Sequence, residues 1–145
     1  MRRIQRDTRH EEFVKSLTTG EGAIFRDIWR VLLFAAAYGV KKGKRLPLEK
    51  VESNKAMPDS YFSTPGWRGF LFLLGFAESS NSEHLKNDEE QQNKLITAFE
   101  EYANFGLVEI SSRVSSPSSA LGDLVGLLLE TSISTQASPD VADLI

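Results

Sequence analysis

The stretch IFRDIWRVLLFAAAYGVKKGKR, residues 24–45, decides the fold class of this 145-residue chain. Apolar side chains recur through it at helical intervals from Ile24 to Ala35. Because the run from Val31 to Val40 is apolar on nearly every side, the second half of this helix is expected to cross a protein core. That run is about half as long as a membrane span requires, so the pattern predicts a buried helix of a soluble, globular domain.

Weaker helical patterns lie on both sides of this helix. Apolar residues at helical spacing surround Val14 and then fill residues 67–76, 95–103 and 121–128. Asp7 or Thr8, Thr64-Pro65, Asn87 and Ser115-Ser116-Pro117 offer start signals for these four helices. Residues 47–63 form a long connection between helices. In residues 2–6, polar and apolar side chains alternate weakly, as in a short strand. We therefore predict a mainly α, single compact domain over 1–130, with five or six helices and at most a short N-terminal β-strand. A loosely attached Ser/Thr-rich tail is expected over 131–145.

Glycines within these helices carry separate expectations. Gly66, Gly69 and Gly75 each lower helix propensity by about 1 kcal/mol relative to alanine, which suggests close helix packing there. Gly39 and Gly43 offer C-terminal caps for the helix that begins near Ile24, and Gly106 is expected to end or kink the helix that begins near residue 88.

Two helix faces can also be assigned. In the helix near residue 100, Leu95 and Phe99 face the core, while Glu100 and Glu101 are expected to face solvent. For the last helix, the expected buried stripe consists of Leu121, Leu124, Val125 and Leu128.

Charge is divided unevenly along the chain. Residues 1–50 hold 12 Lys/Arg against 6 Asp/Glu, residues 51–145 hold 5 against 14, and the whole chain has a net charge of −3. Such an asymmetry between the two parts points to a polyanionic partner.

The cations of the basic part gather in two clusters, which are the candidate nucleic-acid-binding residues. These are Arg2, Arg3, Arg6 and Arg9 in the first cluster, and Lys41, Lys42, Lys44 and Arg45 in the second. The first cluster also fits an ordinary solvated N-terminus. The second fits a helix C-cap, where a cation contributes about 0.3–1 kcal/mol, although four cations in five residues exceed what a cap needs. If both clusters share one face, contact with the phosphates of duplex DNA is favoured. If they lie apart, or pair with the chain's own carboxylates, a protein–protein adaptor is favoured.

The sequence offers no catalytic or metal-binding signature. It contains no cysteine, and His10-Glu11-Glu12 lacks the second histidine of a zinc-protease motif because position 14 is valine. Neither a nucleophile elbow nor a phosphate-binding glycine loop is present. The acidic residues 88–90 and the pair Glu100-Glu101 are interpreted as capping and solvated residues. We therefore expect no enzymatic activity, no metal and no cofactor. Since the N-terminus lacks an apolar secretory run, a cytoplasmic protein is expected.

Several separated blocks resemble the DNA phosphorothioation (Dnd) system-associated protein 4 family. They are RRIQRD (2–7) with HEEFVK (10–15), the segments within 25–39 and 43–48, and FEEYAN (99–104) with Gly106-Leu107. The resemblance covers residues 2–110, departs at Phe105, and leaves the C-terminal tail unexplained. It implies an accessory protein of bacterial gene clusters that modify DNA with sulfur and restrict unmodified, often phage, DNA. The implied partners are duplex DNA through its backbone and other proteins of the defence cluster. No catalytic residue is carried over, and association with a second copy stays open.

Overall fold

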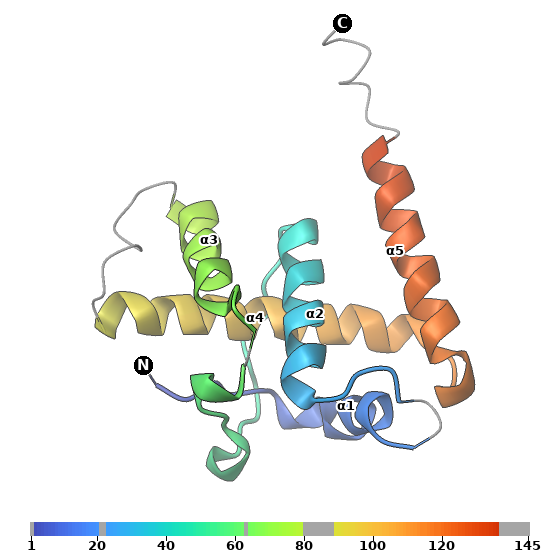
Figure 1. The fold of residues 1–145 in the computed structure, drawn as a ribbon, viewed down its shortest axis with the longest axis horizontal. Coiled ribbons are helices and arrows are strands. Elements are labelled where there is room, and N and C mark those ends of the chain that lie inside the picture. Colours follow the sequence, from blue (N-terminus) through green and yellow to red (C-terminus); the bar gives the residue numbers. More distant parts are fainter. Residues whose placement is uncertain (1, 21–22, 63, 80–88, 137–145) are drawn as a thin grey trace, which may run out of the picture.

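The long helix α4 (Glu89–Arg113) is the element on which the rest of the chain packs (Figure 1). In the computed structural model, which describes residues 2–20, 23–62, 64–79 and 89–136, it is accompanied by four other helices. These are α1 (Glu11–Thr18), α2 (Ile28–Lys42), α3 (Trp67–Ser79) and α5 (Ala120–Gln136). Within those ranges the only β pairing is an isolated antiparallel bridge between Ile4 and Met57. The prediction of a mainly α single domain is confirmed, and the N-terminal strand is reduced to this bridge.

Helices α2 and α4 cross with their backbones in contact. A Cβ atom built on Gly39 of α2 would lie 2.4 Å from the carbonyl oxygen of Tyr102, and one built on Gly106 of α4 would lie 2.0 Å from that of Ala35. Both distances are far inside van der Waals contact, so each helix offers the other a position without a side chain. Gly106 thus allows the crossing, and α4 continues past it to Arg113. The expectation that Gly106 ends the helix is wrong. Gly39 likewise lies inside α2, which continues to Lys42, so the expectation that it caps that helix is wrong too.

An aromatic cluster attaches α3 to α4. Phe62 stacks on Trp67 with ring centroids 4.2 Å apart, and both rings meet Phe99 edge-on at 5.7 and 4.9 Å. Aromatic pairs in these geometries add to the stabilisation given by their buried area. By contrast, a Cβ built on Gly66 or Gly69 would meet nothing within 4 Å, so the close packing expected at these two glycines is not found.

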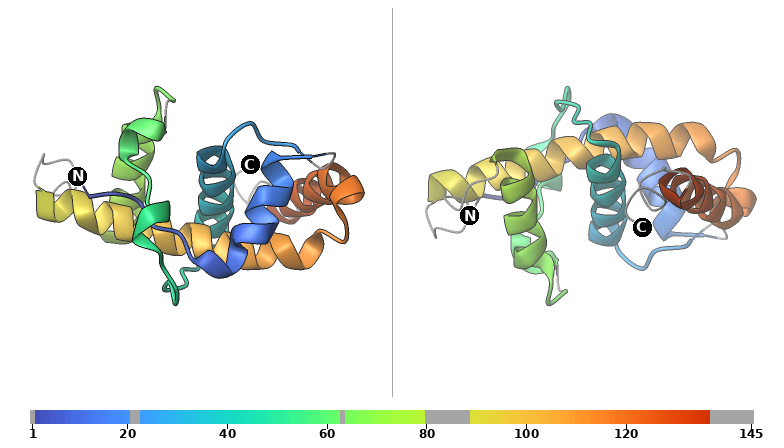
Figure 2. Two further views of the ribbon diagram at one scale, coloured as in Figure 1. Left: turned by 90° about the horizontal axis from the view of Figure 1, so that it is seen from below. Right: turned by 90° about the horizontal axis from the view of Figure 1, so that it is seen from above.

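The N-terminal segment runs along α4 in the same direction as the helix (Figure 2). Its two ends are fixed by buried polar groups of α4. Glu100 accepts hydrogen bonds from the Arg2 guanidinium at 2.8 and 2.9 Å and from the Gln5 backbone N–H at 2.6 Å. Eight residues after Arg2, His10 Nε2 lies 2.9 Å from Asn104 Oδ1. Since the Glu100 side chain is only 7 % exposed, the expectation that it faces solvent is wrong.

Helix ends follow the expected capping chemistry at two places. Asp7 precedes a 3₁₀ turn that leads into α1, and its carboxylate accepts from the Arg9 N–H at 3.1 Å. Gly43 ends α2 in the left-handed region, with φ of 68°, and its N–H donates to Val40 O at 3.0 Å. Asn87, the expected cap of α4, lies outside the described residues.

Helix α5 differs from the prediction in extent and in orientation. It continues to Gln136, beyond the predicted domain boundary at residue 130, while residues 137–145 lie outside the described part. Its buried residues are Ala120, Leu124 and Leu127. Of the expected stripe, only Leu124 is buried, and the rest of that stripe faces solvent.

Stability is expected to depend on pH through His10. Burial lowers its pKa below the ordinary value and Arg9 adds to this, whereas the hydrogen bond to Asn104 and the charges of Asp7 and Glu11 act in the opposite direction. The unfolded chain therefore binds a proton more readily, so stability should fall as pH drops below about 6.5. We expect a lower melting temperature at pH 5.5 than at pH 7.5, and a smaller difference for His10→Gln. If the melting temperature fell by the same amount between pH 7.5 and pH 5.5 in the natural chain and in His10→Gln, His10 would not be the source of the pH dependence.

Candidate functional site

The two predicted basic clusters lie at opposite ends of α2. Arg3 and Arg6 line a cleft with Ile28 and Trp29, the first residues of the helix, whereas Lys41 and Lys42 are its last two residues. A helix of 15 residues is about 22 Å long. In Figure 1 the N-terminal segment passes below α4, and the C-terminal end of α2 rises above it. Arg3 and Arg6 of the first cluster are therefore separated from Lys41 and Lys42 of the second by the length of α2.

Three of the four N-terminal arginines are paired with the chain's own carboxylates. Arg2 binds Glu100 as described above. The side chain of Arg6 is 8 % exposed, and its Nε donates to Glu11 at 2.6 Å. Arg9 lies 3.3 Å from the buried carboxylate of Asp7, and 3.4 Å from the exposed carboxylate of Glu49. An arginine paired in this way adds little to the outward field of the protein, and a phosphate would have to compete with its carboxylate.

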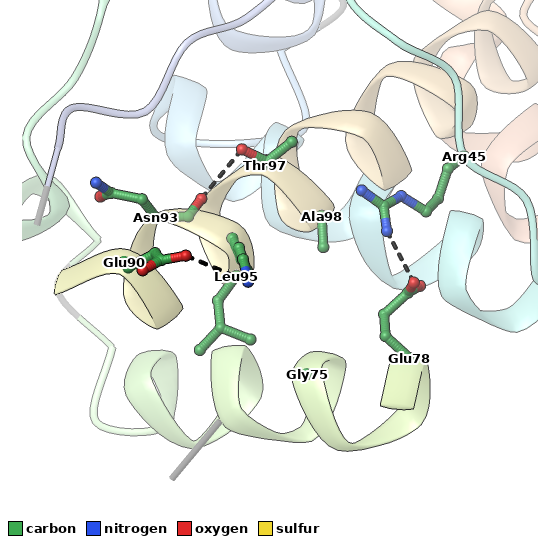
Figure 3. Close-up of a pocket in the computed structure, with 9 residues that line it drawn as sticks. Arg45, Gly75, Glu78, Glu90, Asn93, Leu95, Thr97 and Ala98 are labelled. Carbon is green, nitrogen blue, oxygen red and sulfur yellow. Dashed lines mark hydrogen bonds and ion pairs between the residues drawn. The ribbon is translucent and has the colours of Figure 1, made fainter. Parts of the chain in front are cut away.

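Arg45, from the second cluster, is engaged in the same manner at the edge of a pocket between α3 and α4 (Figure 3). It contacts Glu78 at 2.8 Å and Glu101 at 3.2 Å, and its guanidinium lies 5.6 Å from the centre of the Tyr102 ring. Tyr102 also donates a hydrogen bond to Glu78. Burial, and then this bond, raise the pKa of Tyr102 to about 12, so the phenol keeps its proton.

The pocket itself has a volume of about 500 Å³ and is lined by mainly apolar surface. Gly75 forms part of one wall and Leu95 and Ala98 part of the other, while Glu90 and Asn93 lie along α4 beside them (Figure 3). Its polar groups are largely engaged with one another, as in the pair Lys94–Glu90 at 3.6 Å. This arrangement holds α3 against α4.

More positive charge is exposed to solvent at the other four predicted nucleic-acid-binding residues. Arg3 donates to the carbonyl of Ala56 at 3.3 Å and has no ion pair among the described residues. Lys42 lies over the Tyr38 ring at 5.7 Å, and Lys44 lies over the Phe105 ring at 5.9 Å. Lys41, Lys42 and Lys44 are all exposed. Binding of nucleic acid by the eight residues stays a prediction, but the structure divides them between two places.

A polar cleft of about 800 Å³ opens at the N-terminal end of α2. Four cations from three segments of the chain line it: Arg3, Arg6, Arg26 and Lys55. Asp27 stands at the N-cap position of α2, but its side chain makes no capping hydrogen bond, and it pairs instead with Arg30 at 3.2 Å. Asp27 also lines the cleft, so its carboxylate offsets the partial positive charge of the helix N-terminus there.

Helix α5 presents an uncovered apolar row. Leu121, Val125, Leu128 and Leu129 are between 46 % and 61 % exposed within the described structure. Their spacing of four, three and one places them on one side of the helix, away from the buried Leu124. In Figure 1, α5 extends from the end of α4 away from the other helices.

The described ranges contain neither a candidate metal cluster nor a candidate membrane-spanning helix. No group of three or more His, Asp or Glu side chains there is arranged to hold a metal ion. None of the helices in those ranges combines the length and the apolar character that crossing a membrane requires.

The sequence identified some parts of these sites and missed others. Arg26 and Lys55 stand outside both basic runs, and only the fold brings them beside Arg3. No local signal marks them. The apolar row of α5 was visible as apolar spacing and was interpreted as core, because a helix that is apolar on most sides does not reveal which side is covered.

The comparisons with known proteins give one match. A family model described as DNA sulphur modification system-associated protein 4 matches residues 3–145, which includes the C-terminal tail. No curated protein and no solved structure matches the chain.

Proposed function

The chain belongs to the DNA sulphur modification system-associated protein 4 family, and we propose that it serves that system as a non-enzymatic adaptor. In this role it binds another protein of the same system through α5. The absence of catalytic motifs from the sequence supports a role without chemistry. The wider role implied by the resemblance, restriction of unmodified phage DNA, would then be carried out by the partner.

The exposed row Leu121, Val125, Leu128 and Leu129 carries this proposal. Exposed apolar patches on a folded domain commonly mark surfaces that bind another protein. A helix bound in an apolar groove presents side chains at spacings of three, four and seven, as this row does. We therefore expect the partner to offer an apolar groove of helix width.

The charged residues of α5 are consistent with a partner whose binding surface is apolar. Asp123 accepts from Ser119 Oγ at 2.8 Å and from the Ser115 N–H at 3.1 Å. Glu130 is paired with Arg113 at 2.7 Å. Because both carboxylates already have partners within the chain, a bound protein does not need to supply cations opposite them.

Backbone contact with duplex DNA is the alternative function. It is favoured by the three exposed lysines Lys41, Lys42 and Lys44 at the end of α2. It is weakened because Arg2, Arg6, Arg9 and Arg45 are paired internally, and because the whole chain is acidic. Half of the eight cations on which that function depends are therefore compensated.

The expected partner is a larger nuclease or ATPase of the same system, and the adaptor proposal predicts loss of its binding in Leu121→Asp/Leu129→Asp. The full chain is co-expressed with each protein of its DNA sulphur modification system, and complexes are isolated at high salt after nuclease treatment. We expect one partner to co-purify with the natural chain, and its affinity for the variant to fall by at least about thirtyfold, since central apolar anchors contribute about 2 kcal/mol or more.

Leu73→Asp is the matched control, because Leu73 is also highly exposed but lies on α3. It should leave partner binding unchanged. Equal loss in both variants, or co-purification that nuclease abolishes, would contradict the adaptor proposal. A dimer of the isolated chain that Leu121→Asp/Leu129→Asp dissolves would replace the heterologous partner with a second copy. Retardation of any duplex at about 50 mM salt, reversed by neutralising the three lysines, would favour the DNA alternative.

A further inference from the structure

We propose that the cleft at the N-terminal end of α2 binds an unpaired nucleotide, either free or as part of a single DNA strand. This goes beyond the adaptor role, because the cleft lies at a different part of the molecule from the apolar row of α5. Its walls come from the N-terminal segment, from Thr18 and Thr19 at the end of α1, from residues 26–29, and from the connection between Asn54 and Tyr61.

Arg3 and Arg26 supply the charge for a phosphate. Both line the cleft, both are exposed, and neither has an ion pair among the described residues. Arg6 and Lys55 also line it, and both are paired with Glu11, at 2.6 and 3.5 Å. Arg3 and Arg26 are therefore available for a ligand in a cleft whose other two cations are already paired with a carboxylate. The planar guanidinium group of an arginine can donate two parallel hydrogen bonds to the oxygens of a phosphate.

Aromatic and neutral polar groups supply sites for a base and a sugar. The ring of Tyr61 is 57 % exposed at the wall of the cleft, where Trp29 also lies. An exposed aromatic face accepts any base by stacking. Thr18, Asn54 and Ser60 add hydrogen-bonding groups to the same wall. A site for an inorganic anion alone would have no use for the aromatic wall.

The size of the cleft selects a single nucleotide over a duplex. Its volume of about 800 Å³ lies within the range of about 300–1,000 Å³ typical of small-molecule sites. A paired base cannot reach such a space without leaving its stack, which costs energy that an unpaired base does not require. Single-stranded DNA and free nucleotides are therefore the ligands that fit.

The test uses the full chain, with a short fluorescent oligothymidylate, thymidine monophosphate, inorganic phosphate and a duplex as separate ligands. We expect the oligothymidylate or the monophosphate to bind. Arg3→Ala/Arg26→Ala should weaken that binding at least about tenfold, since each hydrogen bond to a charged group contributes about tenfold or more. Tyr61→Ala should weaken it about fivefold or more through loss of stacking.

Lys50→Ala/Lys94→Ala is the matched control, because it removes the same charge from exposed residues that do not line the cleft. It should leave binding unchanged, and all variants should keep the melting temperature of the natural chain. The proposal is overturned if the control weakens binding as much as Arg3→Ala/Arg26→Ala does. It is also overturned if inorganic phosphate binds as tightly as the monophosphate, or if no nucleotide binds at about 50 mM salt. None of these outcomes bears on partner binding by α5.

Discussion

Replacing Gly106 with alanine is expected to lower the melting temperature by about 10 °C or more, or to prevent folding. The added methyl group would stand 2.0 Å from the carbonyl oxygen of Ala35 and 2.6 Å from its carbonyl carbon. These are backbone atoms of a helix, so they cannot rotate away as a side chain does. To relieve the overlap, α2 and α4 would have to separate along their whole contact, at a cost of about 3 kcal/mol or more.

Gly126→Ala is the control for this substitution. Gly126 also lies inside a helix, but a Cβ there meets nothing within 4 Å. Alanine should therefore stabilise α5 by about 1 kcal/mol through helix propensity alone. Thermal unfolding of both variants, followed by circular dichroism at 222 nm, separates the two effects. Equal melting temperatures for the two variants would mean that the helices do not approach as closely as described.

Glu100→Ala is expected to destabilise the fold by about 3 kcal/mol, as observed when one partner of a buried ion pair is removed. The substitution removes the buried acceptor of the Gln5 N–H and the charge partner of the Arg2 guanidinium, which keeps only its neutral acceptors, such as Thr97 Oγ1 at 2.7 Å. Glu100→Gln should cost less, because the amide oxygen still accepts a hydrogen bond although the charge is lost. The measurement is the free energy of unfolding from urea titration.

The neighbouring residue gives the comparison. Glu101 pairs with Arg45 at a more exposed position, where an ion pair contributes about 0–1 kcal/mol. Glu101→Ala should therefore have a small effect. If the two alanine variants lost the same free energy of unfolding, the N-terminal segment would not depend on Glu100.

The positions of the helices could be predicted because apolar periodicity reports local burial. The continuity of α4 could not, since Gly106 is explained by Ala35, which lies 71 positions earlier in the chain. The burial of Glu100 could have been predicted from the sequence. Ile96, Ala103 and Leu107 stand four before, three after and seven after it, which places Glu100 on their buried side of the helix.

The candidate site, too, could be predicted from the sequence only in part. The N-terminal arginines were recognised as a cluster, but a sequence does not reveal that Arg2 meets Glu100 or that Arg6 is covered beside Glu11. The blocks that carry the family resemblance are largely these contact residues. Asn104, in one of them, binds His10 and also donates to the carbonyls of Leu46 and Pro47 at 3.1 Å. Their pattern therefore marks how the fold is held together.

The central place of α4 has a consequence for synthesis. Translation proceeds from the N-terminus, so α1, α2 and α3 leave the ribosome before the helix against which α2 and α3 pack. Until residues 89–113 emerge, Arg2 has no Glu100, His10 has no Asn104 and the groove at Gly39 has no Tyr102. The nascent chain must keep the apolar faces of α2 and α3 from aggregating during that interval, and cooperative folding cannot begin until α4 has left the ribosome.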